Sequence, residues 1–350
     1  MAPRGFGSGL SPEAALARGC WVKLICGASN QDLASIEDLT GIFALAGVHC
    51  IDAAADPAVV AAVRRGLAWA EARGAVRPWV MLSLSDGVDP HFRKAWFDPL
   101  QCPPACPRPC ERVCPALAIG VAATGGPGVA ADRCYGCGRC LPACPHGLIE
   151  ERGQVLAGEA VAALLAQLRP DAVELHTQPG RGAAFEARLG QLVASGVPLR
   201  RLAVSAGMEG TAQSTAALAA ELWQRFALLR GHEFRPIWQL DGRPMSGDVG
   251  AGTARASVGL LAAVAPLAPP GPLQLAGGTN AQTLPRLRAL APLRNRVAGV
   301  AFGGVARRLL QPLLLEAQGR GRPLLAEEAL WPRALGLAQD LVSPWLERPE

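Results

Sequence analysis

Lysine is scarce in this chain, tyrosine occurs once, and no run of basic residues is dense enough to form a stripe. The 34 Lys and Arg residues and 29 Asp and Glu residues give a net charge of +5, and basic pairs such as Arg200–Arg201 are isolated. Solvated helix faces account for such pairs, and the aromatic-rich basic motifs of nucleic-acid-binding modules are missing. The composition therefore argues against a nucleic-acid partner.

Long apolar runs are also missing. The most apolar stretch, Val258–Ala268, is broken by Pro266 and ends at a further pair of prolines, so it is too short to span a bilayer. Met1–Leu10 contains three glycines and no apolar core, which does not fit a secretory leader. We therefore expect a cytoplasmic protein without a transmembrane segment. In that compartment clustered cysteines more often hold metal than form disulfides.

Eleven cysteines are the most informative residues, and eight of them form two short runs. The second run is Cys134-Tyr-Gly-Cys137-Gly-Arg-Cys140-Leu-Pro-Ala-Cys144-Pro145, which has the C-x2-C-x2-C-x3-C-P spacing of bacterial ferredoxins. Three closely spaced cysteines wrap three corners of one cubane cluster, and the turn carries the fourth to the other cluster. Gly136 and Gly138 tolerate positive φ, which lets backbone N–H groups point at the sulfurs.

The first run is Cys102-Pro-Pro-Ala-Cys106-Pro-Arg-Pro-Cys110-Glu-Arg-Val-Cys114-Pro115, with three residues in each of its first two gaps. By ferredoxin logic, one cluster is held by Cys102, Cys106, Cys110 and Cys144, and the other by Cys134, Cys137, Cys140 and Cys114. We predict two iron–sulfur clusters of the [4Fe–4S] type, and the wider spacing leaves open a [3Fe–4S] cluster at the first site. Structural zinc and disulfides are the alternatives, but zinc ribbons use two CxxC pairs with a longer spacer.

Outside the cysteine runs, short apolar strands alternate with amphipathic helices. We expect strands at Val22–Cys26, Val48–Ala53, Trp79–Leu84, Ala172–His176, Arg201–Ser205, Pro236–Leu240, Leu273–Ala276 and Val297–Phe302. Eight such βα units, about 250 residues without the cysteine segment, indicate a closed (β/α)8 barrel. An open doubly wound sheet is the alternative, although no GxGxxG follows the first strand.

The predicted fold is thus α/β, a TIM-like (β/α)8 barrel with an inserted ferredoxin-like domain of the bacterial two-cluster type. Residues 1–97 supply three βα units, residues 98–150 form the insertion, and residues 151–318 complete the barrel. Residues 319–350 are a C-terminal tail or a final helix.

Chemistry is also expected at the carboxyl ends of the barrel strands. Glu174 and His176 stand two apart on one strand and so point the same way, as a structural or a catalytic pair. Other polar or thiol groups at strand ends are Cys26, Asp52, Ser83, Ser205 and Asp241. Barrels often bind phosphate after their last two strands, which makes flavin mononucleotide (FMN) a candidate ligand, although tight turns also need glycine. The glycines concerned are Gly277, Gly278, Gly303 and Gly304.

The remaining cysteines and histidines carry weaker signals. Cys20, Cys26 and Cys50 are expected to be small buried thiols. His91 and His146 show no metal-ligand spacing of their own.

Several stretches resemble one known family. They are Lys23-Leu-Ile-Cys-Gly-Ala-Ser29 with Gln31-Asp-Leu33, Ile51-Asp-Ala-Ala-Ala-Asp-Pro-Ala58, Asp89-Pro-His-Phe-Arg-Lys94 and Cys144-Pro-His-Gly-Leu-Ile149. Together with both cysteine runs, including the odd spacing of the first, they resemble the light-dependent period A (LdpA) family of cyanobacteria. The resemblance covers the first 150 residues well and the rest more loosely.

The resemblance implies an iron–sulfur protein that feeds cellular redox state, and hence light conditions, into the circadian clock. It also implies partners among clock and input proteins. Two functions follow, and the first is favoured: a redox sensor or electron-transfer protein without catalysis, which exchanges electrons with a quinone or a soluble carrier. The second is a flavin-dependent oxidoreductase in which the two clusters carry electrons between the active site of the barrel and an outside donor.

Overall fold

The barrel that the sequence predicts is present and closed. The computed structural model describes residues 9–27, 31–89, 91–121, 127–208, 214–243, 250–290, 293 and 296–348. Within them, eight parallel strands follow each other in the order β1-β12-β11-β10-β9-β8-β3-β2. They are β1 (Trp21–Ile25), β2 (Cys50–Ala54), β3 (Trp79–Ser85), β8 (Ala172–His176), β9 (Arg201–Gly207), β10 (Pro236–Asp241), β11 (Leu273–Ala276) and β12 (Val297–Phe302).

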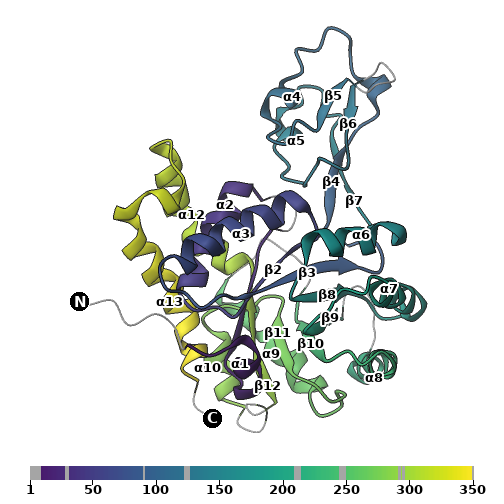
Figure 1. Cartoon of the computed structure of the whole chain (residues 1–350), viewed down its shortest axis with the longest axis vertical. Helices are drawn as coiled ribbons and strands as arrows, with labels where there is room; N and C mark the ends of the chain where they lie inside the picture. The colour runs from purple at the N-terminus through teal and green to yellow at the C-terminus, as the bar shows by residue number, and fades with distance from the viewer. Residues whose placement is uncertain are drawn as a thin grey trace.

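Helices surround the strands (Figure 1). Those that follow barrel strands are α2 (Leu33–Leu45), α3 (Pro57–Glu71), α6 (Gly158–Leu168), α7 (Gly182–Ala194), α8 (Thr215–Gly231), α9 (Ala254–Val264), α10 (Thr283–Arg288) and α12 (Gly304–Gly319). α3 begins at Pro57, and the Asp56 side chain caps it by accepting the Ala58 N–H at 2.9 Å. Closure excludes the open-sheet alternative, since β1 pairs with β12 over Trp21–Leu24.

Local boundaries differ slightly from the sequence-based expectation. β2 begins at Cys50 rather than Val48, because Gly47 turns the chain with φ 101° and the Val48 N–H still donates to the Phe43 carbonyl oxygen of α2. The first eight residues, which were expected to lack a secretory pattern, lie outside the described residues, as do residues 28, 29 and 90 of the family-like stretches.

One end of the barrel is closed by an apolar cluster. It joins α1 (Pro12–Arg18) to the first residues of the strands, with Trp21 and Trp79 in edge-to-face contact at 5.5 Å between ring centroids. The polar ends of the strands therefore gather at the opposite end, where barrel proteins place their chemistry.

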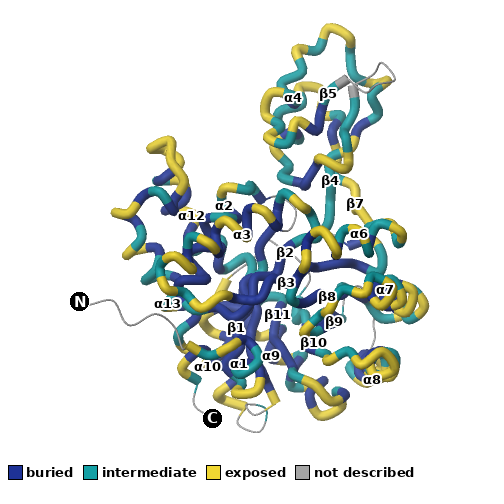
Figure 2. The backbone as a smooth tube through the Cα atoms, in the orientation of Figure 1, coloured by how far each residue is buried: buried dark blue, intermediate teal, exposed yellow. Residues whose placement is uncertain are grey.

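The segment between β3 and α6 leaves the barrel and projects from it (Figure 1). β4 (Arg93–Trp96) and β7 (Glu150–Gly153) pair antiparallel at its base. Beyond them lie the short turn Pro99–Gln101, α4 (Pro109–Val113), the pair β5 (Ile119–Val121) and β6 (Pro127–Val129), and α5 (Cys140–Ala143). Burial is concentrated in the barrel strands, whereas the insertion is largely intermediate or exposed (Figure 2).

The C-terminal segment ends in a helix, α13 (Trp331–Leu346), which follows the short turns Leu324–Ala326 and Glu328–Leu330. It is tied to the barrel through α2 and α3: the Asp38 carboxylate accepts the N–H groups of Leu324 and Leu325 at 3.0 Å, and Trp331 meets Trp69 edge-on. None of the helices that the structure describes is long and apolar enough to cross a bilayer.

Candidate functional site

Two short helices position the last cysteines of each run. α4 carries Cys110 and is followed by Cys114, and α5 begins at Cys140 and is followed by Cys144. Cys114 and Cys144 both have extended backbones, with ψ of 105° and 113°, so the chain turns away from the helix at each of them. The last cysteine of a run is thereby separated from the three before it.

The eight thiols gather around two cavities of the insertion. Cys102, Cys106, Cys110 and Cys144 line the first. Cys114, Cys134, Cys137 and Cys140 line the second. Each cavity therefore takes three cysteines from one run and the last cysteine of the other, which is the crossed arrangement that the spacing predicts. Ile119 lines both cavities and so lies between them.

The donor chemistry of each cavity fits an iron–sulfur cluster, since four thiolates are the usual ligand set of a [4Fe–4S] cluster. Burial raises the pKa of the Cys140 thiol to about 12. Burial also acts to raise the pKa of Cys144, but backbone N–H groups of the following residues outweigh it and lower the pKa. The Ala118 N–H donates to Cys114 Sγ at 3.2 Å. Backbone donors thus already point at the sulfurs.

The glycines of the second run behave as expected, with φ of 80° at Gly136 and 74° at Gly138. Charged side chains near the cysteines form ion pairs. Arg108 Nη1 lies 3.3 Å from Glu111 Oε1, and Arg139 pairs with Asp32, which lies just before α2. The Arg139 contact ties the insertion to the barrel.

A larger cavity of about 370 Å³ lies where the insertion meets the barrel mouth. Barrel residues such as Ser83 and Leu84 line one side, the segment around His91 lines another, and Tyr135 closes the insertion side. Tyr135 also lines the second cysteine cavity. One aromatic side chain therefore stands between the cysteine-lined cavity and the barrel mouth.

Inside the barrel, the Lys23 ammonium is fully buried between two carboxylates. Its Nζ lies 2.8 Å from Asp52 Oδ2 and forms a second ion pair with Glu174. Burial alone lowers the pKa of Lys23, but the carboxylates outweigh it and raise the pKa above its ordinary value. For Glu174 burial acts in the opposite direction and raises the pKa, but the Lys23 charge and the contact with His176 outweigh it and lower the pKa to about 2.

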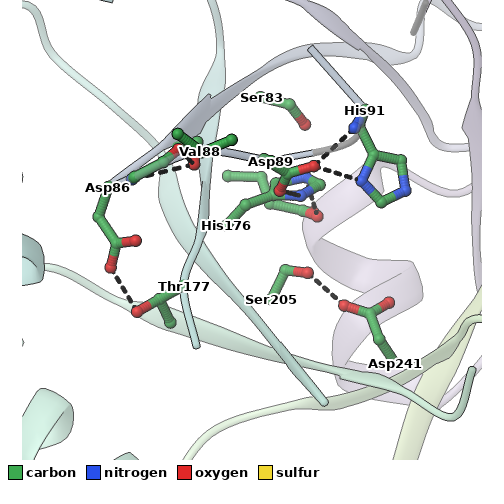
Figure 3. A network of polar contacts seen from close by, with 12 residues as sticks. Ser83, Asp86, Val88, Asp89, His91, His176, Thr177, Ser205 and Asp241 are labelled. Carbon is green, nitrogen blue, oxygen red and sulfur yellow. Dashed lines mark hydrogen bonds and ion pairs between the residues drawn. The ribbon is translucent and has the colours of Figure 1, made fainter. Parts of the chain in front are cut away.

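Most of the strand-end residues expected from the sequence belong to this network. Ser83 Oγ donates to Asp52 Oδ1 at 2.6 Å. Ser205 Oγ donates to Asp241 (Figure 3). Gln239 Nε2 donates to Glu174 Oε1 at 2.7 Å. Sequence reasoning missed Lys23 and Gln239, although a lone lysine inside an apolar strand of a lysine-poor chain is a usable signal.

Glu174 and His176 point the same way, as their spacing predicts, with 3.2 Å between Glu174 Oε1 and His176 Nε2. The other ring nitrogen of His176 contacts Asp89 (Figure 3). Cys26 stands apart from the network: it is buried, its Sγ lies 3.7 Å from Thr40 Oγ1, and burial raises its pKa to about 12. Cys20 and Cys50 are buried too, as predicted.

The glycines expected to contact a flavin lie in the loop after β11 and at the start of α12. Gly277 and Gly278 have φ of 62° and 89°, and a Cβ at Gly277 would lie 2.6 Å from the Arg243 carbonyl oxygen. Gly303 and Gly304 begin α12. None of the four is among the described residues that line the 370 Å³ cavity. The flavin contact stays a prediction.

Comparisons with known proteins agree with the resemblance seen in the sequence. The model of the light dependent period A C-terminal domain matches residues 164–344, and the model of the LdpA Fe-S cluster-binding domain matches residues 102–155. "Light dependent period A" of Synechococcus elongatus is 46% identical over 338 residues, which cover 95% of this chain and 93% of the relative.

Solved structures resemble this chain only distantly. The carboxyl transferase domain of Rhizobium etli pyruvate carboxylase is 10% identical with a TM-score of 0.42, over 97% of this chain and 53% of that one. Mycobacterium tuberculosis tryptophan synthase is 13% identical with a TM-score of 0.35, over 95% of each chain. Neither likeness bears on function. The family matches do: this chain belongs to the light-dependent period A family and carries its iron–sulfur cluster-binding domain.

Proposed function

We propose that this chain is a cytoplasmic redox sensor that holds two [4Fe–4S] clusters and conveys cellular redox state, and hence light conditions, to the circadian clock. The observation that carries the proposal is the division of eight cysteines into two cavities of four. Each bound cluster would accept and release single electrons, which changes the charge of the insertion. The name of the Synechococcus relative supports the link to light and period.

The protein's own residues would hold and shield the clusters. Ile119, Phe97 and Ile149 form one buried apolar cluster beside the cavities and would limit the access of water to a bound cluster. The N–H groups that point at Cys144 and Cys114 stabilise negative charge on the sulfurs. Because the insertion projects from the barrel (Figure 1), it is accessible to other molecules. We propose clock and input proteins as its partners and a quinone or a soluble electron carrier as its donor.

The test is a redox titration of anaerobically purified protein, monitored by electron paramagnetic resonance. Iron and acid-labile sulfide are counted on the same sample. Two reducible clusters with potentials inside the cell's redox range would support sensing, and a three-iron signal would assign a [3Fe–4S] cluster to the first site. Protein that holds zinc in place of iron, with no cluster signal, would overturn the proposal.

A flavin-dependent oxidoreductase is the second candidate. It is favoured by the 370 Å³ cavity, which is within the size range of small-molecule sites and shares Tyr135 with the second cysteine cavity. Acid precipitation of the purified protein would then release a yellow, fluorescent flavin. Protein that contains no flavin and fails to bind added flavin mononucleotide would rule this candidate out.

A further inference from the structure

Three side chains that the iron–sulfur function does not use meet at the barrel mouth. Asp89 Oδ1 lies 2.6 Å from His91 Nδ1, and Asp89 Oδ2 lies 3.0 Å from His176 Nδ1 (Figure 3). One ligand atom from each of the three lies within 4.8 Å of the other two. Ligand atoms bound to one ion with bonds of about 2.1 Å are about 3.0–3.4 Å apart when they are neighbours, so small side-chain movements would bring these three atoms to an ion.

We propose that Asp89, His91 and His176 bind one divalent transition-metal ion, distinct from the iron–sulfur clusters. Two imidazoles and one carboxylate are borderline donors that suit zinc(II) or iron(II), and three protein ligands leave coordination positions open. His91 lines the 370 Å³ cavity, so the open positions are accessible from it.

The fold explains why these residues meet. β3 and β8 are neighbours in the barrel, with Ser85 opposite His176. Asp89 and His91 lie in the segment that leaves β3, and the Asp89 carboxylate also accepts the His91 backbone N–H at 2.7 Å. The three ligands therefore come from the carboxyl ends of two adjacent strands, where the side chains converge.

A second carboxylate stands behind one of the histidines. Glu174 Oε1 is 3.2 Å from His176 Nε2, and Glu174 is itself held by Lys23 and Gln239. A carboxylate on the far nitrogen of a metal-binding histidine favours a proton there and leaves the near nitrogen free to bind metal. In this arrangement His176 Nδ1 faces Asp89 and the proposed ion.

The charges of the network also favour a cation. Asp52, Glu174 and Asp89 bring three carboxylates together, linked through Lys23 and His176. With neutral histidines, the Lys23 ammonium leaves two negative charges, which one divalent ion balances. The net charge of this network is negative whether or not the nearby Asp241 carboxyl group is ionised.

Zinc uptake by the full chain with its clusters intact tests the proposal. Anaerobic protein is dialysed against micromolar zinc chloride, and zinc, iron and sulfide are measured by mass spectrometry and colorimetry. We expect one zinc per wild-type chain, with a loss of at least ten-fold in Asp89→Asn and His176→Gln. His232→Gln, a matched change at an exposed histidine, keeps the zinc. Iron and sulfide stay unchanged in every sample.

A second measurement, the melting temperature with and without zinc, distinguishes loss of metal binding from poor folding of a variant. Zinc should raise the melting temperature of the wild type and of His232→Gln, but not that of His91→Gln, which changes a partly exposed residue at the cavity. Equal zinc uptake by all variants, or zinc that enters only as iron is lost, would overturn the proposal. Such a result would leave the redox titration of the clusters unaffected, so the two proposals fail separately.

Discussion

Cys140 and Cys144 stand at the two ends of one short helix, α5, and line different cavities. The same holds for Cys110 and Cys114 around α4. Each helix thus carries a thiol for one cavity within it and a thiol for the other cavity just after its end. The crossed arrangement makes a specific prediction for cysteine variants.

We predict that Cys144→Ser damages the cluster of the first run, although Cys144 belongs to the second. Cys114→Ser should damage the cluster of the second run. Each variant should lose one of two signals in the redox titration and up to half of the iron, because one thiolate of four is removed. Cys20→Ser, at a buried thiol outside both cavities, is the control and should keep the full iron content. Loss of the second-run signal in Cys144→Ser would contradict the crossed assignment.

Lys23 is expected to be essential for stability. Lys23→Met leaves Asp52 and Glu174 buried without their cation, which should lower the free energy of unfolding by about 3–5 kcal/mol. Adding Glu174→Gln should recover part of this loss, because one of the two uncompensated charges is removed. Denaturant unfolding of the single and double variants measures the recovery.

The matched control for Lys23 is Lys94→Met. Lys94 pairs with Asp56 at 3.9 Å and is partly exposed, so this change should cost about 1 kcal/mol or less. If Lys23→Met and Lys94→Met lower the free energy of unfolding equally, the buried ion pairs of Lys23 do not stabilise the protein as expected.

His49 should make the protein sensitive to mild acid. Burial lowers its pKa from 6.5 to about 4, so the folded state favours the neutral ring, whose Nδ1 accepts the Val22 N–H at 3.2 Å. The unfolded chain binds the proton first, and stability present above pH 6.5 is lost as the pH falls toward 4. Between pH 7.5 and pH 5 the free energy of unfolding should fall by about 2 kcal/mol more in the wild type than in His49→Gln. Parallel stability curves for the two proteins would refute this.

Two glycines on helices should respond in opposite ways to the same substitution. A Cβ at Gly66 would lie 2.4 Å from the Glu37 carbonyl oxygen, so Gly66→Ala forces α3 away from α2 and should cost about 1–3 kcal/mol. Gly190 is exposed on α7 with no atom within 4 Å of its Cβ position, so Gly190→Ala should gain about 0.5–1 kcal/mol from helix propensity. Melting temperatures that fall in both variants would show that the close contact of α2 and α3 is not the cause.

Some features of the site were within reach of sequence reasoning and others were not. The sequence predicts the strand that carries Glu174 and His176, and their common direction follows from the two-residue period of a strand. His91 showed no ligand spacing of its own, because its partner His176 comes from another strand, with the whole insertion in between. The phosphate contact expected from the glycine pairs after β11 and β12 stays a prediction, and the close approach of Gly277 to the Arg243 backbone is visible only in the tertiary structure.

The sequence by itself determined the barrel and the cysteine division. Both depend on short-range patterns: the alternation of strands and helices, and the spacing of thiols within runs of about a dozen residues. Only the tertiary structure decided that Lys23 lies between Asp52 and Glu174, and that Asp89 and His91 face His176. These contacts join strands that are distant in the chain, and the closure and register of the barrel place them together. A local sequence pattern carries no information about which side chains face each other inside the closed barrel.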